Sequence, residues 1–323
     1  MIESNNVRIS LDRRERESDI DFISHAHTDH LGAARSSKGI LASQQTMDLI
    51  ESAYGLSVRN RASCAENMRL LEAGHMLGSR QLSVDCEKAG ARITYTGDFQ
   101  TSKSRTARRI EAVDSDVLIM DSTYADSLLR FDDKEEVESA LQDWTIGKIR
   151  KGIVIFSAYA MGKAQELIAI LNEVGIKPLV SRKISRVSMV YQANGVRLDY
   201  SSAYDSDESY GSLIRDNFVG ITDSRGLASF KAGLQAAHNK RVYTAVATGF
   251  AKIFRFDTDA QFALSDHADF SQSVEYIEAS RSSKVLTYGP NAGQFAANLS
   301  RDGYDAEPFS DASAAMAMAA CRA

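Results

Sequence analysis

The chain has 323 residues, of which 25% are charged and 44% are apolar, and its formal net charge is −5. This composition is typical of a soluble globular protein with one large domain or two ordinary ones. The negative charge excludes a global attraction to nucleic acid, so a polyanionic partner would need a local basic patch or bound metal ions.

Cysteine usage and hydropathy bear on the compartment. The three cysteines, Cys64, Cys86 and Cys321, form no CxxC pair, which favours a reducing compartment over a disulfide framework. No apolar run approaches the length of a membrane span, and the first residues lack the pattern of a signal peptide. We therefore expect a cytoplasmic protein without a membrane partner.

The first two predicted strands lead to the densest polar cluster of the chain. Residues 7–11 alternate polar and apolar side chains as a strand does, and they end at Asp12. Asp12 is either an ordinary strand-end carboxylate or a group that orients a nearby metal ligand. Residues 19–24 form a second alternating segment and run directly into His25.

Residues 25–30 hold three of the six histidines, in the order His25-Ala-His27-Thr-Asp29-His30. Imidazole and carboxylate groups both suit zinc and similar ions. His25 and His27 can point the same way on an extended backbone, whereas Asp29 and His30 follow a turn and can face a second ion. The alternatives are a histidine-rich surface loop and a single incidental zinc site.

Two more candidate ligands follow, each at the end of a predicted strand. His75 lies between the predicted strands 68–72 and 81–85, and Asp98 lies just past the strand predicted at residues 91–96. A lone histidine is more often structural, but coupling to the upstream cluster favours His75 as a ligand. The segments before them predict a strand at residues 39–43 and a helix at residues 45–54.

These residues and their order resemble the metallo-β-lactamase superfamily. The segment from His25 to His30 resembles its HxHxDH signature, Ala-Gly-His75 resembles its third motif, and Thr-Gly-Asp98 resembles its fourth. The resemblance implies an αββα sandwich in which Asp98 bridges two metal ions. It also implies that an aspartate after an early strand, here Asp12, supports the histidine loop.

Two later segments narrow the resemblance to the β-CASP nucleases, a branch that acts on nucleic acids. A buried-type strand ends at Asp121, and Asp-Ser-Thr-Tyr is similar to β-CASP motif A, although Asp-Ser-Thr also suits a helix cap. The segment Ser265-Asp-His267-Ala-Asp269 resembles motif B. The resemblance implies that Asp121 holds His267 near the substrate phosphate.

The resemblance also predicts the domain organisation. Residues 1–125 and 256–323 would form a discontinuous metallo-β-lactamase domain, and residues 126–255 an inserted β-CASP α/β domain. Within the insert, a strand, a small-residue turn and a helix beginning near Lys163 form a natural anion site. The basic runs at residues 181–186 and 105–109 either follow a phosphate backbone or are solvated faces.

One position departs from the family pattern. The predicted strand 284–289 carries Tyr288 near its end, at the position where RNA-processing members carry the motif C histidine that binds the second metal ion. Three protein ligands then remain for that ion, so its affinity should fall. The Artemis-type DNA nucleases also lack this histidine, so the departure does not imply inactivity. Tyr288 could instead hydrogen-bond a water molecule or a phosphate oxygen.

The predicted protein is a metal-dependent phosphodiesterase that cleaves single-stranded RNA in 3′-end processing or decay. It resembles most the archaeal mRNA 3′-end processing factors and β-CASP exonucleases. One zinc ion would be held by His25, His27, His75 and Asp98, and a second, weaker ion by Asp29, His30 and Asp98, with manganese as an alternative metal. Asp29, Asp121 and His267 would be catalytic, and Lys163 and Tyr288 would contact phosphate. The alternatives are a DNA exonuclease of the same fold and a non-catalytic RNA-binding partner.

Overall fold

The computed structural model describes residues 1–58, 61–87, 90–202, 216–223 and 227–310. The chain forms two compact units, Met1–Arg130 with His267–Ala323, and Phe131–Asp266. The sequence placed these two breaks slightly earlier, after residues 125 and 255. The sequence also predicts a small-residue helix at the C-terminus, which lies outside the described residues.

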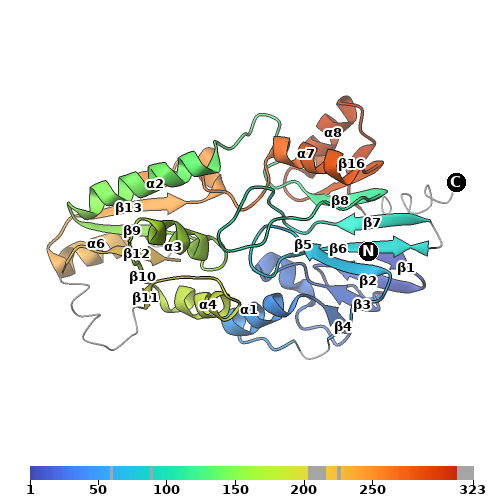
Figure 1. Ribbon diagram of the computed structural model, residues 1–323, viewed down its shortest axis with the longest axis horizontal. Helices are drawn as coiled ribbons and strands as arrows, with labels where there is room; N and C mark the ends of the chain where they lie inside the picture. Colours follow the sequence, from blue (N-terminus) through green and yellow to red (C-terminus); the bar gives the residue numbers. More distant parts are fainter. Residues whose placement is uncertain (59–60, 88–89, 203–215, 224–226, 311–323) are drawn as a thin grey trace. The chain divides into compact units, whose positions relative to one another are not determined.

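The first unit contains two sheets. The smaller sheet has the order β1-β2-β3-β4, and the larger has the order β16-β15-β8-β7-β6-β5 (Figure 1). The strands of the smaller sheet are β1 (Ile2–Ser4), β2 (Val7–Leu11), β3 (Ile20–Phe22) and β4 (Gly39–Leu41). Those of the larger sheet are β5 (Met68–Glu72), β6 (Arg80–Cys86), β7 (Ala91–Tyr95), β8 (Val117–Asp121), β15 (Lys284–Tyr288) and β16 (Ala306–Pro308).

The core of this unit lies between the two sheets. Ile9, Phe22 and Leu41 of the smaller sheet form one buried cluster with side chains of the larger sheet, among them Leu82 and Ile119. Every residue of β8 is buried, because its two faces are both covered. Burial of this much apolar surface is the main stabilising contribution, at roughly 25 cal/mol per Å².

Helices cover the outer faces of the sheets. On the larger sheet, α7 (Phe270–Ser280) and α8 (Ala292–Arg301) bury Tyr276 and Phe295 against Leu118 and Met120 of β8. In Figure 1 these two helices lie above the larger sheet, and α1 (Gln44–Tyr54) lies beside the smaller one, next to β3 and β4. The first unit is thus a four-layer αββα sandwich.

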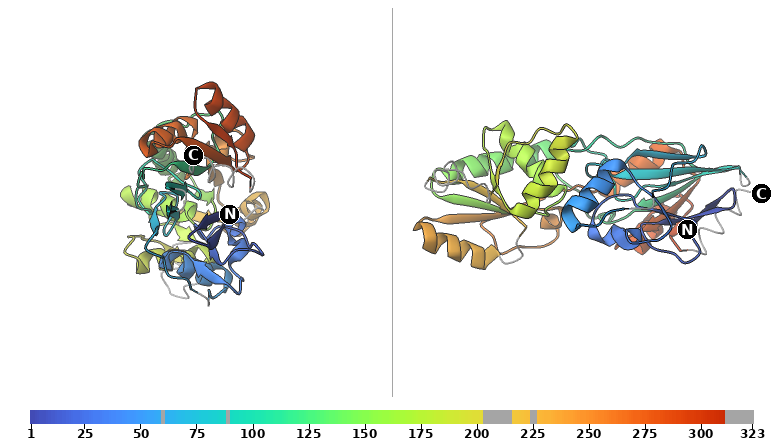
Figure 2. Two further views of the ribbon diagram at one scale, coloured as in Figure 1. Left: turned by 90° about the vertical axis from the view of Figure 1, so that its right-hand side faces the viewer. Right: turned by 90° about the horizontal axis from the view of Figure 1, so that it is seen from below.

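The second unit is a parallel sheet of order β11-β10-β12-β9-β13-β14 with helices on both faces (Figure 2). Its strands are β9 (Ile153–Ser157), β10 (Leu179–Val180), β11 (Ser201–Ser202), β12 (Val219–Thr222), β13 (Val242–Ala247) and β14 (Ala260–Phe262). Its helices are α2 (Lys134–Ile149), α3 (Lys163–Glu173), α4 (Arg182–Ala193) and α6 (Leu227–His238), with the short η3 (Gly249–Lys252).

Alternate residues of β9 face opposite sides of this second sheet, as a strand requires. Ile153 and Ile155 pack in the cluster that includes Leu234 of α6. Phe156 contacts Trp144 of α2, with ring centroids 6.0 Å apart. The continuous apolar run of β9 is therefore explained by burial on both faces, which is usual in parallel sheets.

Candidate metal centre

The candidate site lies where parallel strands of both sheets of the first unit end. In the smaller sheet, β2 and β3 are parallel and lead to Asp12 and His25. In the larger sheet, β7 and β8 are parallel and lead to Asp98 and Asp121. Carboxyl ends of parallel strands are a usual place for binding sites, because the chain turns there into loops.

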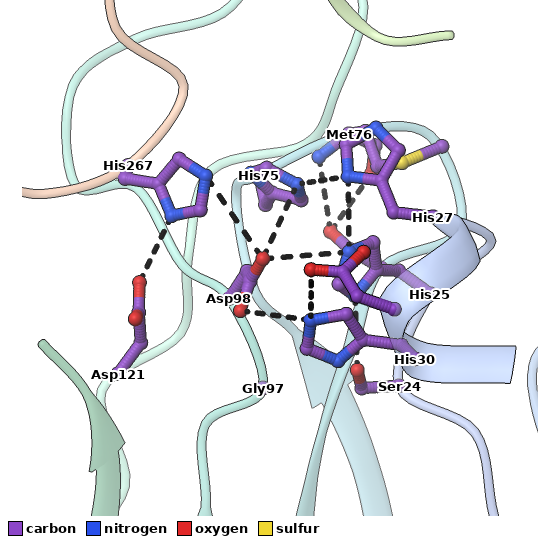
Figure 3. Close-up of polar contacts among 12 residues, drawn as sticks. Ser24, His25, His27, His30, His75, Met76, Gly97, Asp98, Asp121 and His267 are labelled. Carbon is purple, nitrogen blue, oxygen red and sulfur yellow. Dashed lines mark hydrogen bonds and ion pairs between the residues drawn. The ribbon is translucent and has the colours of Figure 1, made fainter. Parts of the chain in front are cut away.

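Four predicted ligands converge on one point (Figure 3). Nδ1 of His27 lies 3.1 Å from Nε2 of His25 and 3.1 Å from Nε2 of His75. Oδ2 of Asp98 lies 3.5 Å from Nε2 of His25 and 4.0 Å from Nε2 of His75. Tetrahedral ligands at about 2.1 Å from zinc are roughly 3.4 Å apart, so these four side chains could hold one ion.

The second predicted set is less compact. Nε2 of His30 lies 3.4 Å from Oδ1 of Asp98 and 3.6 Å from Oδ2 of Asp29. The Asp29 side chain is 77% exposed. Within the described residues, no group of three donor atoms that all lie within 4.8 Å of one another includes Asp29 or His30. The geometry therefore favours the first set over the second as a metal site.

Asp12 holds the histidine loop in place. Its carboxylate accepts hydrogen bonds from the amide and hydroxyl of Ser24, at 2.6 and 2.7 Å, and from the hydroxyl of Tyr95, at 2.8 Å. Nδ1 of His30 lies 2.7 Å from the same carboxylate, which leaves Nε2 of His30 directed at Asp98. Asp12 has a positive φ of 55°, a strained conformation of the kind found at functional sites.

Ser24 and Tyr95 were not expected from the sequence. Each stands at the end of a strand with ordinary alternation, and no spacing rule marks either residue as a partner of Asp12. The hydroxyl of Ser24 also lies 3.0 Å from Nδ1 of His25, so one serine contacts both Asp12 and a candidate ligand. In the sequence, only their positions indicate a role: Ser24 precedes His25, and Tyr95 precedes Thr96-Gly97-Asp98.

Burial and charge control the protonation of the cluster. Burial lowers the pKa of His25, and the neighbouring His30 lowers it further, so His25 is neutral, as a metal ligand must be. Burial also lowers the pKa of His30, but the carboxylates of Asp12 and Asp98 outweigh this effect and raise it to about 11. Burial raises the pKa of Asp98, yet the charge of His30 and the hydrogen bond that His30 offers hold it well below its usual value.

His267 approaches the cluster from the segment that follows the second unit. Its Nδ1 lies 2.9 Å from Oδ2 of Asp121, and its Nε2 lies 3.9 Å from Oδ2 of Asp98. Donor atoms of Asp98, Asp121 and His267 all lie within 4.8 Å of one another. Asp121 thus fixes the ring of His267 with one nitrogen directed at the candidate metal centre.

Tyr288 lies beside the site at the end of β15, in register with Asp121 of β8. Its ring packs against Tyr95, with ring centroids 5.1 Å apart. Burial, together with the charge of Asp98, raises the pKa of Tyr288 well above its usual value. A neutral phenol is a hydrogen-bond donor rather than a metal ligand, so Tyr288 does not replace an imidazole.

Lys163 stands at the first position of α3, in the second unit. Its side chain is 2% exposed, and its ammonium group lies 3.4 Å from Oδ1 of Asp266. Burial lowers its pKa, although Asp266 counteracts this effect. Contact between Lys163 and a substrate phosphate therefore stays a prediction, and it would have to compete with this ion pair.

The basic runs are partly neutralised. Lys183, in the first turn of α4, lies 3.4 Å from a carboxylate oxygen of Asp223. Arg108 lies 3.8 Å from a carboxylate oxygen of Glu72. These contacts are typical of solvated charged surfaces, and a role for either run in holding a phosphate backbone stays a prediction.

Gly74 allows the loop of His75 to turn tightly. It has a φ of 79°, and a Cβ atom at this position would lie 2.1 Å from the backbone oxygen of Gln100. We expect Gly74→Ala to lower the free energy of unfolding by more than the roughly 1–3 kcal/mol of backbone strain alone, because the loop must also move. Gly55→Ala is the matched control, since Gly55 has a φ of 65° and open space around it.

Urea unfolding of both variants, with metal content measured on the same samples, tests this prediction. Gly74→Ala should unfold at lower urea concentration than Gly55→Ala and should bind less metal. Equal unfolding midpoints and equal metal content would show that the contact with Gln100 does not constrain the loop.

The αββα sandwich with a histidine and aspartate cluster at its strand ends defines the class of protein as a metallo-β-lactamase fold. No family model matches the chain. A probable DNA ligase of Opitutus terrae is 26% identical over 297 residues, which cover 88% of this chain and 28% of that protein. An RNase J-like protein of Methanocaldococcus jannaschii is 29% identical over 192 residues, 49% of this chain and 44% of that protein.

The endoribonuclease ysh-1 of Neurospora crassa is 37% identical over 105 residues, 31% of this chain and 12% of that protein. The chain thus spans less than half the length of each of these three relatives. These relatives support the β-CASP nuclease branch of the metallo-β-lactamase superfamily for this chain. The family and fold class expected from the sequence motifs are therefore confirmed.

Proposed function

We propose that the chain is a metal-dependent phosphodiesterase that cleaves single-stranded nucleic acid. The observation that carries the proposal is the convergence of His25, His27, His75 and Asp98 at separations that suit one divalent ion. The relatives support a nuclease, since one is named RNase J-like and another is named an endoribonuclease. No helix in the described part of the chain is long and apolar enough to span a membrane.

We assign the first ion to His25, His27, His75 and Asp98. We assign a weaker second ion to Asp29, His30 and Asp98, and this ion would have to displace the proton that Asp12 and Asp98 favour on His30. Zinc suits these imidazole and carboxylate groups best, and manganese is an alternative. When bound, divalent metal ions lower the pKa of water and stabilise negative charge on a phosphate. Location in the cytoplasm stays a prediction from the sequence.

The chain's own residues would supply orientation and a proton. Asp12 would keep His30 turned toward Asp98 through the bond to Nδ1. Asp121 would accept the Nδ1 proton of His267 and stabilise the imidazolium form, whose Nε2 proton would pass to the leaving oxygen or to a phosphate oxygen. The phenol of Tyr288 would donate a hydrogen bond to a phosphate oxygen.

Asp12 offers a test of this orientation. We expect Asp12→Asn to weaken metal binding by about 10- to 100-fold, the usual effect of removing a partner of a metal ligand. Asparagine tolerates the positive φ of this position, so the backbone should be kept. Competition with a fluorescent chelator measures the affinity, and Asp19→Asn, at an exposed carboxylate, is the control. Unchanged affinity would show that Asp12 does not support the ligands.

RNA is the first candidate substrate, because the names of two of the three relatives describe ribonucleases. DNA is the second candidate, and a specific observation favours it. Of the three matches, the probable DNA ligase covers the largest share of this chain, 88%. The chain also lacks a motif C histidine, since Tyr288 stands at that position, and the Artemis-type DNA nucleases lack it too.

Digestion of matched single-stranded RNA and DNA of one sequence separates these candidates. Each strand is labelled at the 5′ end in one set and at the 3′ end in another, so the products also give polarity and distinguish endonuclease from exonuclease action. Cleavage of the RNA alone would support the first candidate, and cleavage of the DNA alone the second. Cleavage of neither strand with metal bound would contradict the proposed function and favour a non-catalytic RNA-binding protein.

A further inference from the structure

An exposed aromatic segment follows η3 in the second unit. Ile253, Phe254 and Phe256 are 50%, 55% and 37% exposed, and they alternate with the cations Lys252 and Arg255 in the sequence Lys-Ile-Phe-Arg-Phe. Most surface residues of this type stand alone, whereas contiguous exposed apolar groups mark interaction sites. We call residues 252–256 the aromatic segment.

A groove of about 400 Å³ adjoins this segment, in the size range of sites for small organic groups. Phe254 and Arg255 line one part of it, Val137 and Ala140 of α2 another, and Phe262 of β14 a third. Phe254 also packs on Phe250, with ring centroids 6.0 Å apart and planes inclined by 33°. The groove thus presents aromatic faces and an apolar floor beside a cation.

One side chain holds the aromatic segment in a fixed conformation. Nε2 of Gln261 donates hydrogen bonds to the backbone oxygens of Ala251, at 2.7 Å, and Phe254, at 3.0 Å. Its Oε1 accepts a hydrogen bond from the backbone amide of Phe256, at 3.1 Å. The exposed rings therefore need little ordering when a ligand binds, which increases affinity.

The charges around the segment favour a single phosphate contact. Lys252 forms an ion pair with Asp132, at 2.8 Å, so its charge is largely neutralised. Arg255 is exposed and forms no ion pair among the residues that the structure describes. Asp257 is also exposed, so the patch as a whole is not strongly basic. Binding here would depend mainly on stacking, with Arg255 as the one cation available for phosphate.

We propose that the aromatic segment and its groove bind the bases of single-stranded nucleic acid, with Phe254 and Phe256 as stacking surfaces and Arg255 on the adjoining phosphate. Aromatic side chains interleaved with cations are the usual means of holding single strands without sequence preference. The inference rests on the proposed function, since it names a second place at which the same substrate is held.

A protein partner is the competing occupant of this surface. Two observations favour a nucleic acid strand: the alternation of rings with cations, and the exposed Arg255 between the two rings. A protein contact of the same size would more often have a contiguous apolar centre with charges only at its rim. Strand binding by variants of the aromatic segment distinguishes the two occupants.

The test compares two labelled strands of about 12 nucleotides, one of thymidylate and one of abasic sites, by fluorescence anisotropy. EDTA is present, so that binding is measured apart from cleavage. We expect Phe254→Ala with Phe256→Ala to weaken binding of the thymidylate strand about 10-fold and to leave the abasic strand unaffected, because stacking is lost. Leu128→Ala, at a residue that is 93% exposed in the other unit, is the control.

Arg255→Gln gives a second, independent measurement. Loss of one phosphate contact should reduce the slope of log affinity against log salt by about 0.7 for a single strand. Phe254→Leu keeps an apolar side chain without a ring and covers the case in which the double variant fails to fold. Equal losses for both strands, or no loss for either, would overturn the proposal. The proposal would also be overturned if the Phe254→Ala, Phe256→Ala variant bound strands normally but no longer self-associated in sedimentation, since the occupant would then be a protein.

A failure of base binding can be distinguished from a failure of the proposed phosphodiesterase activity. Hydrolysis of bis(p-nitrophenyl) phosphate, which has no stacked bases, should be the same in the Phe254→Ala, Phe256→Ala variant and in the unaltered protein. If the unaltered protein hydrolyses no phosphodiester, the proposed function fails. The strand-binding result with EDTA still decides whether the aromatic segment binds bases.

Discussion

Asp98→Asn is expected to reduce nucleic acid cleavage by at least about 10³-fold and to remove most of the bound metal. Loss of a residue that only orients a ligand already costs about 10- to 100-fold, and Asp98 is assigned to both ions. Asparagine matches aspartate in shape, so the fold should be kept. The environment of Asp98 requires a carboxylate, because the charge of His30 holds its pKa well below the usual value.

Metal per chain by mass spectrometry and cleavage of a labelled strand measure the two effects on one preparation. Asp114→Asn removes an exposed carboxylate that pairs with Arg281, and it serves as the control for loss of charge alone. If the Asp98→Asn variant kept its full metal content and activity, Asp98 would not be a ligand and the proposed centre would be wrong.

Unlike Asp98→Asn, His267→Ala should reduce cleavage by about 10²- to 10⁴-fold and leave the metal content unchanged. General acid catalysis contributes an effect of this size. The single nitrogen of His267 that faces Asp98 lies 3.9 Å away, and its other nitrogen is occupied by Asp121. His267 is therefore placed to transfer a proton at the metal centre.

Asp121→Asn tests the pair as a unit. If Asp121 acts only by orienting His267, a variant with both Asp121→Asn and His267→Ala should cleave no more slowly than His267→Ala alone. His238→Ala, at the end of α6, is the control for loss of an imidazole. Additive losses would show that Asp121 has a separate role. Loss of metal in His267→Ala would show that His267 is a ligand rather than a proton donor.

Much of the candidate centre could be predicted because ligand chemistry leaves a local pattern. His25, His27 and Asp29-His30 lie within six residues, and His75 and Asp98 follow strands with clear alternation. The buried strands β8 and β9 were equally visible, since a short continuous apolar run bounded by polar residues is typical of a strand covered on both faces. These features depend on residues that are close together along the chain, so the sequence alone is enough to predict them.

The features that could not be predicted depend on partners far along the chain. Two interpretations of Asp12 are open from the sequence, and the register of β2 on β3 favours the second by setting Asp12 beside Ser24 and His30. The turn before α3 suggested an accessible Lys163, but Asp266, about a hundred residues later, pairs with it in a buried position. The sequence Ile-Phe-Arg-Phe of residues 253–256 would also fit a half-buried strand, and only tertiary packing leaves all three apolar side chains exposed.

Removal and return of metal is the most direct test of the central claim, that the histidine and aspartate cluster holds the ions on which cleavage depends. The protein is stripped with a chelator, its metal content is measured by mass spectrometry, and strand cleavage is followed as zinc or manganese is added back in known equivalents. We predict that stripped protein does not cleave, and that activity returns as the first and then a weaker second equivalent bind. Full cleavage by protein shown to contain no metal would contradict the account.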